Sequence, residues 1–472
     1  MPKARPQLDV YPFAAFLGDL FGCSNMLAIG EATARELAQF YPRFEITGVI
    51  PHADLKRYRS RFEFGTWRQG EFDRNCKIQL DEETLRQTII VCANLLEQIE
   101  NPAYLLEQLK RWLDDAPVCI ITSSDRDLTL GNENHNASAR SVQKGKWNLA
   151  EFEQMLCSEG FNLEFIGLTA SDNVNFEKKN IIAVITNNAA RRPAVVKAPK
   201  DFRVVAFMAA YNEEDIIVES IKKWTAQGVS VHVLENWSTD ATYDLAKRME
   251  GELPVTVERF PKDGPSPHFD WGAMLARMEE LSGEIEADWF VRRGADEVLM
   301  SPWPKMSYRD GLYLVDQAGY NCVDHTVIEF HPIDDGFTAG ADHEAYFRHF
   351  DFGTHFSHMQ QRKAWKNYGQ QISMVESAGH DMPFEGRRVY PFKFLLKHYP
   401  VRSQKHGEKK VFRERKARWN PLERAKGWHV HYDKIGKGHK FLRTASEQLL
   451  FDEEHFQQTY LVERLSGVGV LR

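Results

Sequence analysis

Apolar runs alternate with amphipathic stretches through the middle of the chain. Residues 203–210 form an apolar run that stops at Asn212, and an amphipathic helix with an acidic first turn, capped by Asn212, is expected to follow. Residues 229–235 repeat this pattern, with residues 238–240 opening the next helix. A third apolar run, residues 288–293, leads directly into an acidic pair. This alternation predicts a parallel sheet with right-handed crossovers, whose strand ends converge on one edge.

The acidic pair after the third run consists of Asp296 and Glu297. A carboxylate at the end of a buried parallel strand lies in the crevice where open α/β sheets bind ligands, and it can hold a hard cation. A solvated turn is the alternative interpretation of such a pair by itself. The two upstream units favour a ligand site, because they bring further polar residues to the same edge of the sheet.

Three motifs in this order resemble the family 2 glycosyltransferases, which have the GT-A fold. They are Ala-Ala-Tyr-Asn-Glu-Glu at 209–214, Glu-Asn-Trp-Ser-Thr-Asp at 235–240 and Gly-Ala-Asp-Glu at 294–297, and His-Tyr-Pro-Val-Arg-Ser at 398–403 extends the likeness. The resemblance covers roughly residues 200–445. The chain departs from the family at Gly294, where the first Asp of an Asp-x-Asp motif is usual. It departs again at Glu235 and Asn236, where two acidic residues are usual.

The resemblance implies transfer of a sugar from a nucleotide-sugar donor, with Mn²⁺ or Mg²⁺ neutralising the leaving diphosphate. Asp296 is the expected metal ligand, Glu297 supports it, and His398 completes the metal shell. Arg402 and Lys410 suit phosphate oxygens. Because one family carboxylate is missing, oxygens of the diphosphate are needed to fill the metal shell. A buried ring bonded to the backbone is the competing interpretation of His398.

Recognition of the nucleoside is assigned to residues at the ends of the first two strands, namely Ala210, Tyr211, Glu213, Glu235 and Asn236. Tyr211 can stack on a base, although an aromatic residue at a strand end also suits a core position. The amide of Asn236 can both donate and accept hydrogen bonds, so it can bind a base edge without adding charge.

A general base is expected across the pocket from the metal, because the acceptor hydroxyl loses its proton as it attacks the anomeric carbon. Asp381 is the first candidate and His380 the second, since the Gly-His-Asp run at 379–381 resembles the place where family members carry this base. An ordinary turn residue is the alternative interpretation of Asp381. The rival carboxylates are Asp342, Glu344 and Asp351.

The N-terminal third resembles a class I methyltransferase over roughly residues 20–187. Residues 25–34 have the pattern of a strand that leads into a helix through a small-residue turn, and residues 88–102 resemble the fourth strand of that family and the helix after it. Of the glycines usual in the cofactor loop only Gly30 remains, and residues 47–51 end without the acidic residue that would hold the ribose. We therefore expect a methyltransferase-like domain that has lost adenosylmethionine.

The chain of 472 residues is too long for one core. We expect an α/β protein of two domains, with a Rossmann-like methyltransferase fold at 1–187 and a GT-A fold with a mixed sheet at 201–445. A polar, Pro-bearing linker at 188–200 separates them, and a helical tail at 446–472 follows. The six cysteines stand singly and are expected to be structural thiols in a reducing compartment.

The hydropathy and charge of the chain bear on whether it binds membranes or nucleic acid. No apolar run approaches the ~18 residues of a spanning helix, so a cytoplasmic protein is expected, peripheral at the inner membrane face at most. The net charge is −7, yet residues 387–443 hold 18 Lys and Arg against four acidic residues. A solvated face is the first interpretation of this basic stretch, an anionic membrane that carries a lipid-linked acceptor the second, and nucleic acid the least favoured.

Together these features predict a metal-assisted glycosyltransferase of the hexosyltransferase class, transferring a sugar to a glycan or lipid-linked acceptor, as in polysaccharide biosynthesis. Inversion at the anomeric carbon is implied only by the resemblance. Two other functions stay open. A scaffold that binds glycan or nucleotide without catalysis would explain Gly294, and an active methyltransferase domain would make the protein bifunctional.

Overall fold

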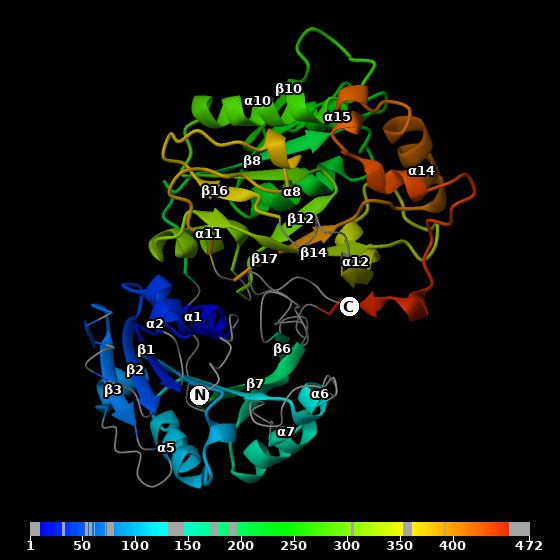
Figure 1. The fold of residues 1–472 in the computed structure, drawn as a ribbon. Helices are drawn as coiled ribbons and strands as arrows, with labels where there is room; N and C mark the ends of the chain where they lie inside the picture. Colours follow the sequence, from blue (N-terminus) through cyan, green and yellow to red (C-terminus); the bar gives the residue numbers. More distant parts are fainter. Residues whose placement is uncertain are drawn as a thin grey trace. The chain divides into compact units, whose positions relative to one another are not determined.

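The computed structural model describes residues 10–30, 34–51, 55, 59–60, 62–70, 72, 80–130, 146–170, 178–187, 196–303, 306–352, 361–390 and 392–452. The chain divides into two compact units, of which the first holds the described residues up to 187 and the second those from 196 to 452 (Figure 1). Each unit is built on a β-sheet with helices packed against it, and both sheet systems are mixed. The expected α/β class with two domains is therefore confirmed.

The first unit is built on one seven-stranded sheet in the order β3-β2-β1-β4-β5-β7-β6. The strands are β1 (Asn25–Gly30), β2 (Glu45–Pro51), β3 (Thr66–Gly70), β4 (Thr88–Ala93), β5 (Val118–Ser124), β6 (Leu163–Ala170) and β7 (Lys178–Thr186). β3, β2, β1, β4 and β5 pair in parallel, whereas β7 is antiparallel to both β5 and β6. This order gives a mostly parallel sheet with an antiparallel edge, which belongs to the α/β class expected for this unit.

Helices cover this sheet on both faces (Figure 1). They are α1 (Val10–Leu20), α2 (Ala34–Leu37), α4 (Glu82–Arg86), α5 (Ala103–Leu113), α6 (Arg126–Leu130) and α7 (Leu149–Ser158), with 3-10 turns at η1 (Ala38–Phe40) and η2 (Leu96–Gln98). Leu105, Leu109 and Trp112 place one stripe of α5 in the core. Gly30 ends β1 at φ +119°, and a Cβ there would lie 2.5 Å from the carbonyl oxygen of Ala93, so only glycine fits.

The central sheet of the second unit has the order β10-β9-β8-β11-β16-β13. Its strands are β8 (Val204–Ala210), β9 (Ser230–Glu235), β10 (Val255–Arg259), β11 (Trp289–Gly294), β13 (Cys322–Val323) and β16 (Ala364–Lys366). β10, β9, β8 and β11 are parallel, as the three apolar runs predicted. β16 is antiparallel to β11 and to β13, which makes the sheet mixed. The carboxyl ends of β8, β9 and β11 therefore share one edge.

A second sheet of five strands, β12-β17-β14-β15-β18, completes this unit. Its strands are β12 (Glu297–Met300), β14 (His325–Phe330), β15 (His349–Phe352), β17 (Phe394–His398) and β18 (Leu449–Leu450). β12 follows β11 after two residues and pairs with β17, so that Glu297 lies opposite His398 in the antiparallel register. The end of β11 and the end of β17 are brought together in this way.

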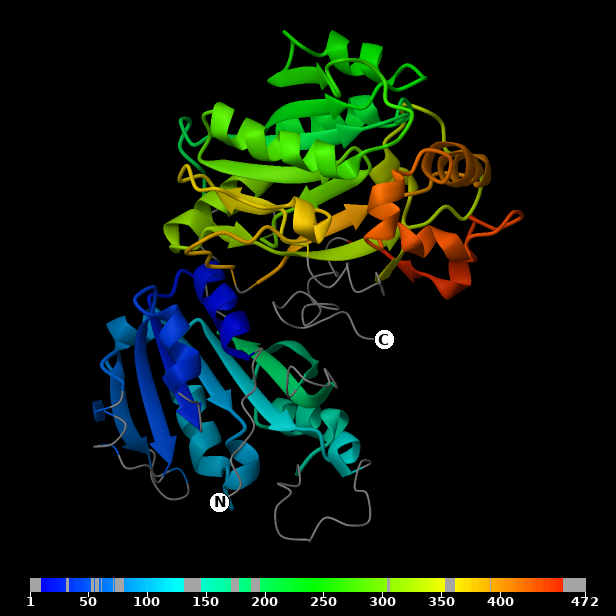
Figure 2. The same ribbon diagram turned by 45° about the horizontal axis from the view of Figure 1, so that its top comes forward.

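The longer helices of this unit are α8 (Ile217–Ala226), α9 (Thr242–Arg248), α10 (Trp271–Glu284) and α11 (Tyr308–Gln317). Shorter ones are α12 (His343–Tyr346), η3 (Val375–Ser377), α14 (Gln404–Glu408), the π-helical η4 (Lys409–Arg415), α15 (Pro421–Ala425), η5 (Val430–Lys434) and η6 (Ala445–Glu447). Figure 2 shows α10, in green, lying across the strands of the central sheet. Met274 and Met278 of α10 pack there on Phe207 and Phe290 in one apolar cluster.

The predicted start of the helix after β8 is wrong. Asn212 does not cap it, because α8 begins only at Ile217 and Ile216 holds the capping position. Asn212 instead has φ +54°, and its side chain bonds Thr239 and Glu414. Likewise α9 begins at Thr242, not within residues 238–240. The polar residues after both strands thus form loops at the carboxyl-terminal edge of the sheet instead of the first turns of helices.

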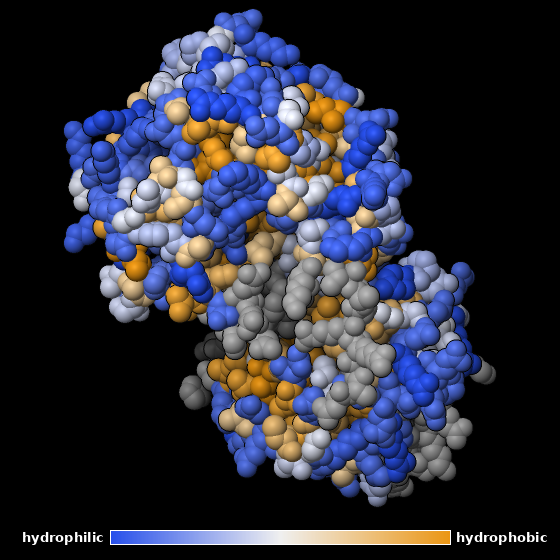
Figure 3. Space-filling model, turned by 180° about the vertical axis from the view of Figure 1, so that it is seen from behind, coloured by the Kyte–Doolittle hydropathy of each residue, from blue (hydrophilic) through white to orange (hydrophobic). Residues whose placement is uncertain are grey.

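The end of the chain and the surface complete the description. The predicted helical tail at 446–472 begins with η6 and β18, and from residue 453 it lies outside the described residues. Within the described ranges, no helix is both long and apolar enough to cross a bilayer. The face in Figure 3 is largely hydrophilic, with hydrophobic residues showing in small groups. Cys23, Cys92, Cys119 and Cys322 are buried, Cys157 is exposed, and none of these five forms a disulfide within the described part of the chain; Cys76 lies outside it.

Candidate functional site

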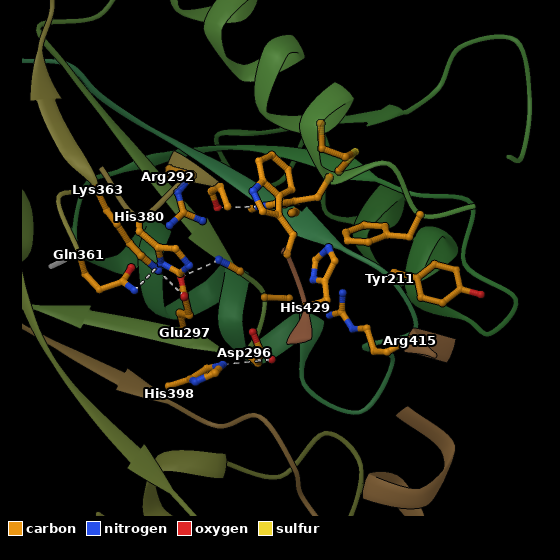
Figure 4. Close-up of a pocket in the computed structure, with 18 of the residues that line it drawn as sticks. Tyr211, Arg292, Asp296, Glu297, Gln361, Lys363, His380, His398, Arg415 and His429 are labelled. Atoms are coloured by element: carbon orange, nitrogen blue, oxygen red, sulfur yellow. Dashed lines mark hydrogen bonds and ion pairs between the residues drawn. The ribbon is translucent and has the colours of Figure 1, made fainter. Parts of the chain in front are cut away.

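A pocket of about 530 Å³ opens at the edge where β8 and β11 end. The loop after β8 supplies Tyr211, the turn between β11 and β12 supplies Asp296, and the start of β12 supplies Glu297 (Figure 4). Its further walls come from segments far apart in the sequence, through Phe269, Trp271, Met274, Arg292, Val327, Gln361, Lys363, Glu376, Ser377, Ala378, His380, Leu396, His398, Arg415, Gly427, Trp428, His429, Val430 and Tyr432. The predicted meeting of strand ends at one crevice is thus realised here.

Asp296 lies at the centre of a buried charge network. Its Oδ2 accepts a hydrogen bond from Lys410 Nζ at 2.8 Å and lies 3.7 Å from His398 Nε2. Burial raises the pKa of Asp296, but Lys410 and His398 outweigh burial and hold the pKa well below its usual value. Among the residues that the structure describes, none bonds Oδ1, the second carboxylate oxygen. Asp296 therefore presents one uncommitted oxygen to the pocket.

Gly294 makes room for that oxygen. A Cβ at position 294 would lie 2.7 Å from Asp296 Oδ1, closer than non-bonded atoms approach. Glycine at position 294, where the family usually has Asp, therefore leaves the space that the Asp296 carboxylate occupies.

Arg402 and Glu213 anchor the loop after β8 beneath the pocket. The guanidinium of Arg402 is 1% exposed, bonds Asp215 at 2.8 and 2.9 Å, and also bonds Glu213. Lys410 Nζ reaches Glu213 Oε1 at 3.2 Å. Arg402 and Lys410 do not line the pocket themselves. The structure therefore shows both as buried partners of carboxylates, and phosphate binding by either stays a prediction.

His398 stands between two carboxylates. Its Nδ1 lies 3.1 Å from Glu329 Oε1, while its Nε2 faces Asp296. Burial lowers the pKa of His398, yet hydrogen bonds and charge from Asp296 and Glu329 raise it to about 10. Both ring nitrogens are engaged by acids, and a protonated ring has no lone pair for a metal. Glu329 was missed in the sequence, where it is the one acidic residue in the otherwise buried strand at 325–330.

Glu297 turns away from Asp296 toward a different partner (Figure 4). Its Oε1 forms an ion pair with the buried Lys363, and its Oε2 accepts a hydrogen bond from the backbone of Gly294 at 2.8 Å. Burial raises the pKa of Glu297, but Lys363 and Arg292 outweigh it and lower the pKa to about 2. Within the described part of the chain, no three His, Cys, Asp or Glu residues gather as a metal site. Asp296, Glu297 and His398 therefore do not converge on one ion.

On the side of the loop after β8, Tyr211 lines the pocket and Arg418 lies over its ring, with Cζ 4.1 Å from the centroid. Arg418 also donates to Asn236 Oδ1 at 3.2 Å, and Asn236 in turn donates to the carbonyl of Phe260. Ala210 contributes to the wall. Tyr211 and Ala210 are thus brought to the pocket, whereas Asn236 is buried behind it.

Glu235 is placed in the interior. It is fully buried, its Oε1 accepts a hydrogen bond from the backbone of Ser238, and its Oε2 lies 3.4 Å from Arg259. These bonds tie the end of β9 to the loop that follows. Glu235 is not among the pocket-lining residues, and its geometry favours a structural role over contact with a nucleoside.

Asp381 and His380 take different places. Asp381 is outside the pocket lining, and its carboxylate is held by Arg362 at 3.0 Å and Arg387 at 2.6 Å. Burial alone would raise the pKa of Asp381, but the two guanidinium groups outweigh burial and hold the pKa below its usual value. His380 does line the pocket, and its Nδ1 lies 2.8 Å from Gln361 Nε2. Of the two predicted candidates, only His380 faces the cavity.

The pocket holds one carboxylate that sequence reasoning missed. Its acidic residues are Glu213, Asp296, Glu297 and Glu376. The first three are ion-paired. Glu376, in η3, has no ion pair or hydrogen bond from its carboxylate within the described ranges. The rival acids named from the sequence lie elsewhere: Asp342 and Glu344 bind Lys223, and Asp351 lies near His331.

The basic stretch at 387–443 is partly an interior feature. Lys393, Lys397, Arg402 and Lys410 are each at most 5% exposed. Lys393 lies 3.5 Å from Asp324, and Lys397 lies 3.0 Å from Glu344. These four cations neutralise buried carboxylates, and they are not part of a solvated or membrane-facing surface.

Comparisons with known proteins give likenesses of fold only. Neither the family models nor the curated protein sequences match this chain. Solved methyltransferases match its N-terminal part, among them a SAM dependent methyltransferase from Aquifex aeolicus (12% identity, 39% of this chain and 93% of that one, TM-score 0.28). The plantazolicin methyltransferase BamL matches at 14% identity over 39% of this chain and 86% of that one, with a TM-score of 0.32.

A third solved structure is a glycosyltransferase. S. aureus TarS 1-349, crystallised in complex with UDP-GlcNAc, matches at 16% identity with a TM-score of 0.21. The match covers 27% of this chain and 34% of that one, so this chain spans about a third of that protein. Values at this level assign neither an activity nor a ligand to the present chain.

Proposed function

We propose that the second unit transfers a sugar from a nucleotide-diphosphate donor to a hydroxyl of a glycan or lipid-linked acceptor, with inversion at the anomeric carbon. The observation that carries this proposal is the pocket at the carboxyl ends of β8 and β11. There an aromatic ring suited to a base, Tyr211, and a carboxylate suited to a metal-bound diphosphate, Asp296, face one cavity (Figure 4).

A divalent cation fits this site if the diphosphate supplies most of its ligands. Lys410 and His398 both face Oδ2 of Asp296, and Oδ1 has no partner among the described residues. Asp296 Oδ1 is therefore the oxygen free to bind an ion. Mg²⁺ and Mn²⁺ are commonly held by one or two carboxylates together with substrate phosphates. When bound, such an ion neutralises the charge that develops on the leaving diphosphate.

The chain's own residues position the rest of the donor. Lys410 and His398 hold the Asp296 carboxylate ionised and fixed in direction. Arg415 lines the pocket next to Phe269, with its Cζ 5.1 Å from the ring centroid, and brings a positive charge to the wall near Tyr211. A guanidinium at that wall suits the phosphate oxygens of a nucleotide whose base stacks on Tyr211.

Glu376 is the carboxylate best placed to act as the general base. It is the one acid of the pocket lining, among the described residues, that no cation of the chain neutralises. An unpaired carboxylate can accept the proton of an attacking hydroxyl, whereas Asp381 is committed to two arginines. His380, four residues on and in the same wall, can orient that hydroxyl by a hydrogen bond.

A nucleotide-sugar screen tests the proposal. Thermal shift of the full chain should show stabilisation by at least one sugar nucleotide, larger with Mn²⁺ or Mg²⁺ than with EDTA, because a ligand that binds only the folded state raises its melting temperature. Release of the nucleoside diphosphate should then be measured. Asp296→Asn should lower this rate roughly 10²–10³-fold, the usual cost of losing one electrostatic contact in a transition state. Binding without any release would indicate a scaffold instead.

A further inference from the structure

Arg292 is a buried cation that points into the pocket. It lies on β11, two residues before Gly294, and is 6% exposed. Its guanidinium belongs to the pocket wall, at the end opposite Tyr211 and Arg415 (Figure 4). The backbone of Arg292 is fixed by a hydrogen bond from its N–H to the carbonyl of Lys363 at 2.8 Å. The side chain is thus held by a rigid strand and aimed at the cavity.

The guanidinium of Arg292 has no ionic partner. Across the described residues it forms no hydrogen bond or ion pair, and its buried Nε is unsatisfied. Its neighbours are the ring of Trp271, whose centroid lies 5.7 Å from Cζ, and Gly379, where a Cβ would lie 3.2 Å from Cζ. Glu297 acts on it only at a distance, since the carboxylate of Glu297 is bonded elsewhere.

Each of the other buried cations in the described part of this unit has at least one hydrogen-bonding or ionic partner, although Nη1 of Arg293 is unsatisfied too. Arg293, the next residue, donates to Ser220 and to the carbonyl of Ala295. Arg402 binds two carboxylates, and Lys363 and Lys410 each pair with at least one. Burying an unpaired charge costs several kcal/mol, so a guanidinium kept this way on a pocket wall indicates a ligand that supplies the missing anion.

The charge at this end of the pocket specifies that anion. Lys363 and Glu297 neutralise one another, so Arg292 is the cation of this wall that no carboxylate of the described chain binds. One guanidinium matches the one negative charge and the planar fork of a carboxylate. Trp271 lies beside it with its indole Nε1 bonded to the carbonyl of Ala378 at 2.8 Å, so the ring is fixed and able to stack on a sugar.

We propose that Arg292 determines specificity by binding the carboxylate of an acidic sugar, of the uronic acid kind, carried by the donor or by the acceptor. The inference rests on the proposed function in that this sugar lies in the transferase pocket, beyond the diphosphate. In this arrangement Tyr211 and Asp296 bind the nucleotide, and Arg292 binds the carboxylate of the acidic sugar at the opposite end of the pocket.

Matched pairs of ligands that differ only in a carboxylate test this inference. On the donor side, binding of UDP-glucuronate is compared with UDP-glucose, and GDP-mannuronate with GDP-mannose, by calorimetry on the full chain. On the acceptor side, methyl glucuronide is compared with methyl glucoside by saturation-transfer NMR. The wild-type protein should prefer the acidic member of one pair about 10-fold or more, as expected for a charge-assisted contact.

Arg292→Met keeps the length and loses the charge, so the preference should fall to about 2-fold or less. Its melting temperature should stay equal or rise, because an unpaired buried charge is removed. Arg388→Met, a change of the same kind at an exposed arginine outside the pocket lining that also lies over an aromatic ring, should leave the preference intact. A preference in the donor pair or in the acceptor pair says which substrate carries the carboxylate.

Equal binding of both members of every pair by the wild-type protein overturns the inference and leaves sugar transfer standing. A preference that Arg292→Met retains also overturns it. If no sugar nucleotide binds while methyl glucuronide is still preferred through Arg292, the proposed transferase function fails and the carboxylate site stands.

Discussion

Lys410 Nζ lies 2.8 Å from Asp296 Oδ2, although the two residues are 114 positions apart in the sequence. The same ammonium reaches Glu213 Oε1 at 3.2 Å, and thereby joins the loop after β8 to the turn after β11. These are the two loops that form the floor of the pocket. The contact between Lys410 and Asp296 is therefore one of the links that hold the C-terminal segment of the unit at the site, together with the bonds of Arg402 to Glu213 and Asp215.

Removal of the Lys410 charge should destabilise the second unit. Lys410→Met leaves the carboxylates of Asp296 and Glu213 buried without this cation, and breaking a buried ion pair from one side costs about 3–5 kcal/mol. Urea unfolding of the full chain, followed by tryptophan fluorescence, measures the loss. Adding Glu213→Gln should restore part of it, because one of the stranded charges is then removed. A single variant as stable as the wild type would contradict this account.

Turnover should depend on Glu376 and far less on Asp381. Glu376→Gln keeps the shape of the side chain and removes the proton acceptor, so nucleoside diphosphate release in the presence of acceptor should fall roughly 10²–10⁴-fold with donor affinity unchanged. His380→Asn should have a smaller effect. Asp381→Asn weakens pairs with Arg362 and Arg387 outside the pocket and should act on stability first. A collapse of turnover in Asp381→Asn alone would restore it as the base.

The central sheet of this unit could be predicted because its parallel strands β8, β9 and β11 are each marked by a short apolar run in the sequence. The apolar runs at 203–210, 229–235 and 288–293 correspond to β8, β9 and β11, and strands buried on both faces read as continuous apolar sequence. The parallel order then follows from the helices between them. Asp296 and Tyr211 could be found for the same reason, since both directly follow a recognisable strand.

The other half of the site could not be predicted, because long-range pairing decides it. Lys363 binds Glu297 from 66 residues away, and Glu329 reaches His398 from 69 residues away. Nothing near Glu376 or Arg292 in the sequence marks either as a pocket residue. The predicted cap at Asn212 failed for a related reason, since Glu414, 202 residues on, takes its side chain. The conformation that a short stretch of sequence favours is therefore overridden where a residue far along the chain forms a buried hydrogen bond with it.

Adenosylmethionine should not bind the first unit with micromolar affinity. Gly30 fits the tight end of β1, but Ala32 and Ala34 stand where the family has further glycines, and no acidic residue ends the 47–51 strand. Calorimetric titration of the full chain with adenosylmethionine checks this expectation. A saturable heat signal at micromolar concentration would make the protein a candidate for two activities, and S-adenosylhomocysteine should then compete.

His325 should make the second unit lose stability in mild acid. Its ring is fully buried, with Nε2 2.9 Å from the hydroxyl of Tyr308 and Nδ1 2.8 Å from the carbonyl of Gln361. Burial lowers the pKa of His325 from 6.5 to about 4, although its hydrogen bond to Gln361 works in the opposite direction. Because the folded pKa is below the unfolded one, the unfolded chain binds the extra proton between pH 6.5 and 4, and the stability is lost as pH falls through that window.

Each such histidine changes the free energy of unfolding by at most about 1.4 kcal/mol per pH unit in this window. His343, whose pKa burial also lowers to about 4, contributes in the same direction. The double variant Tyr308→Phe/His325→Leu leaves no hydroxyl unpaired and removes one titrating group. Urea unfolding at pH 4.5, 5.5 and 6.5 should give a slope shallower than the wild type by about that amount. An unchanged slope would mean that the buried ring takes up its proton without leaving the fold.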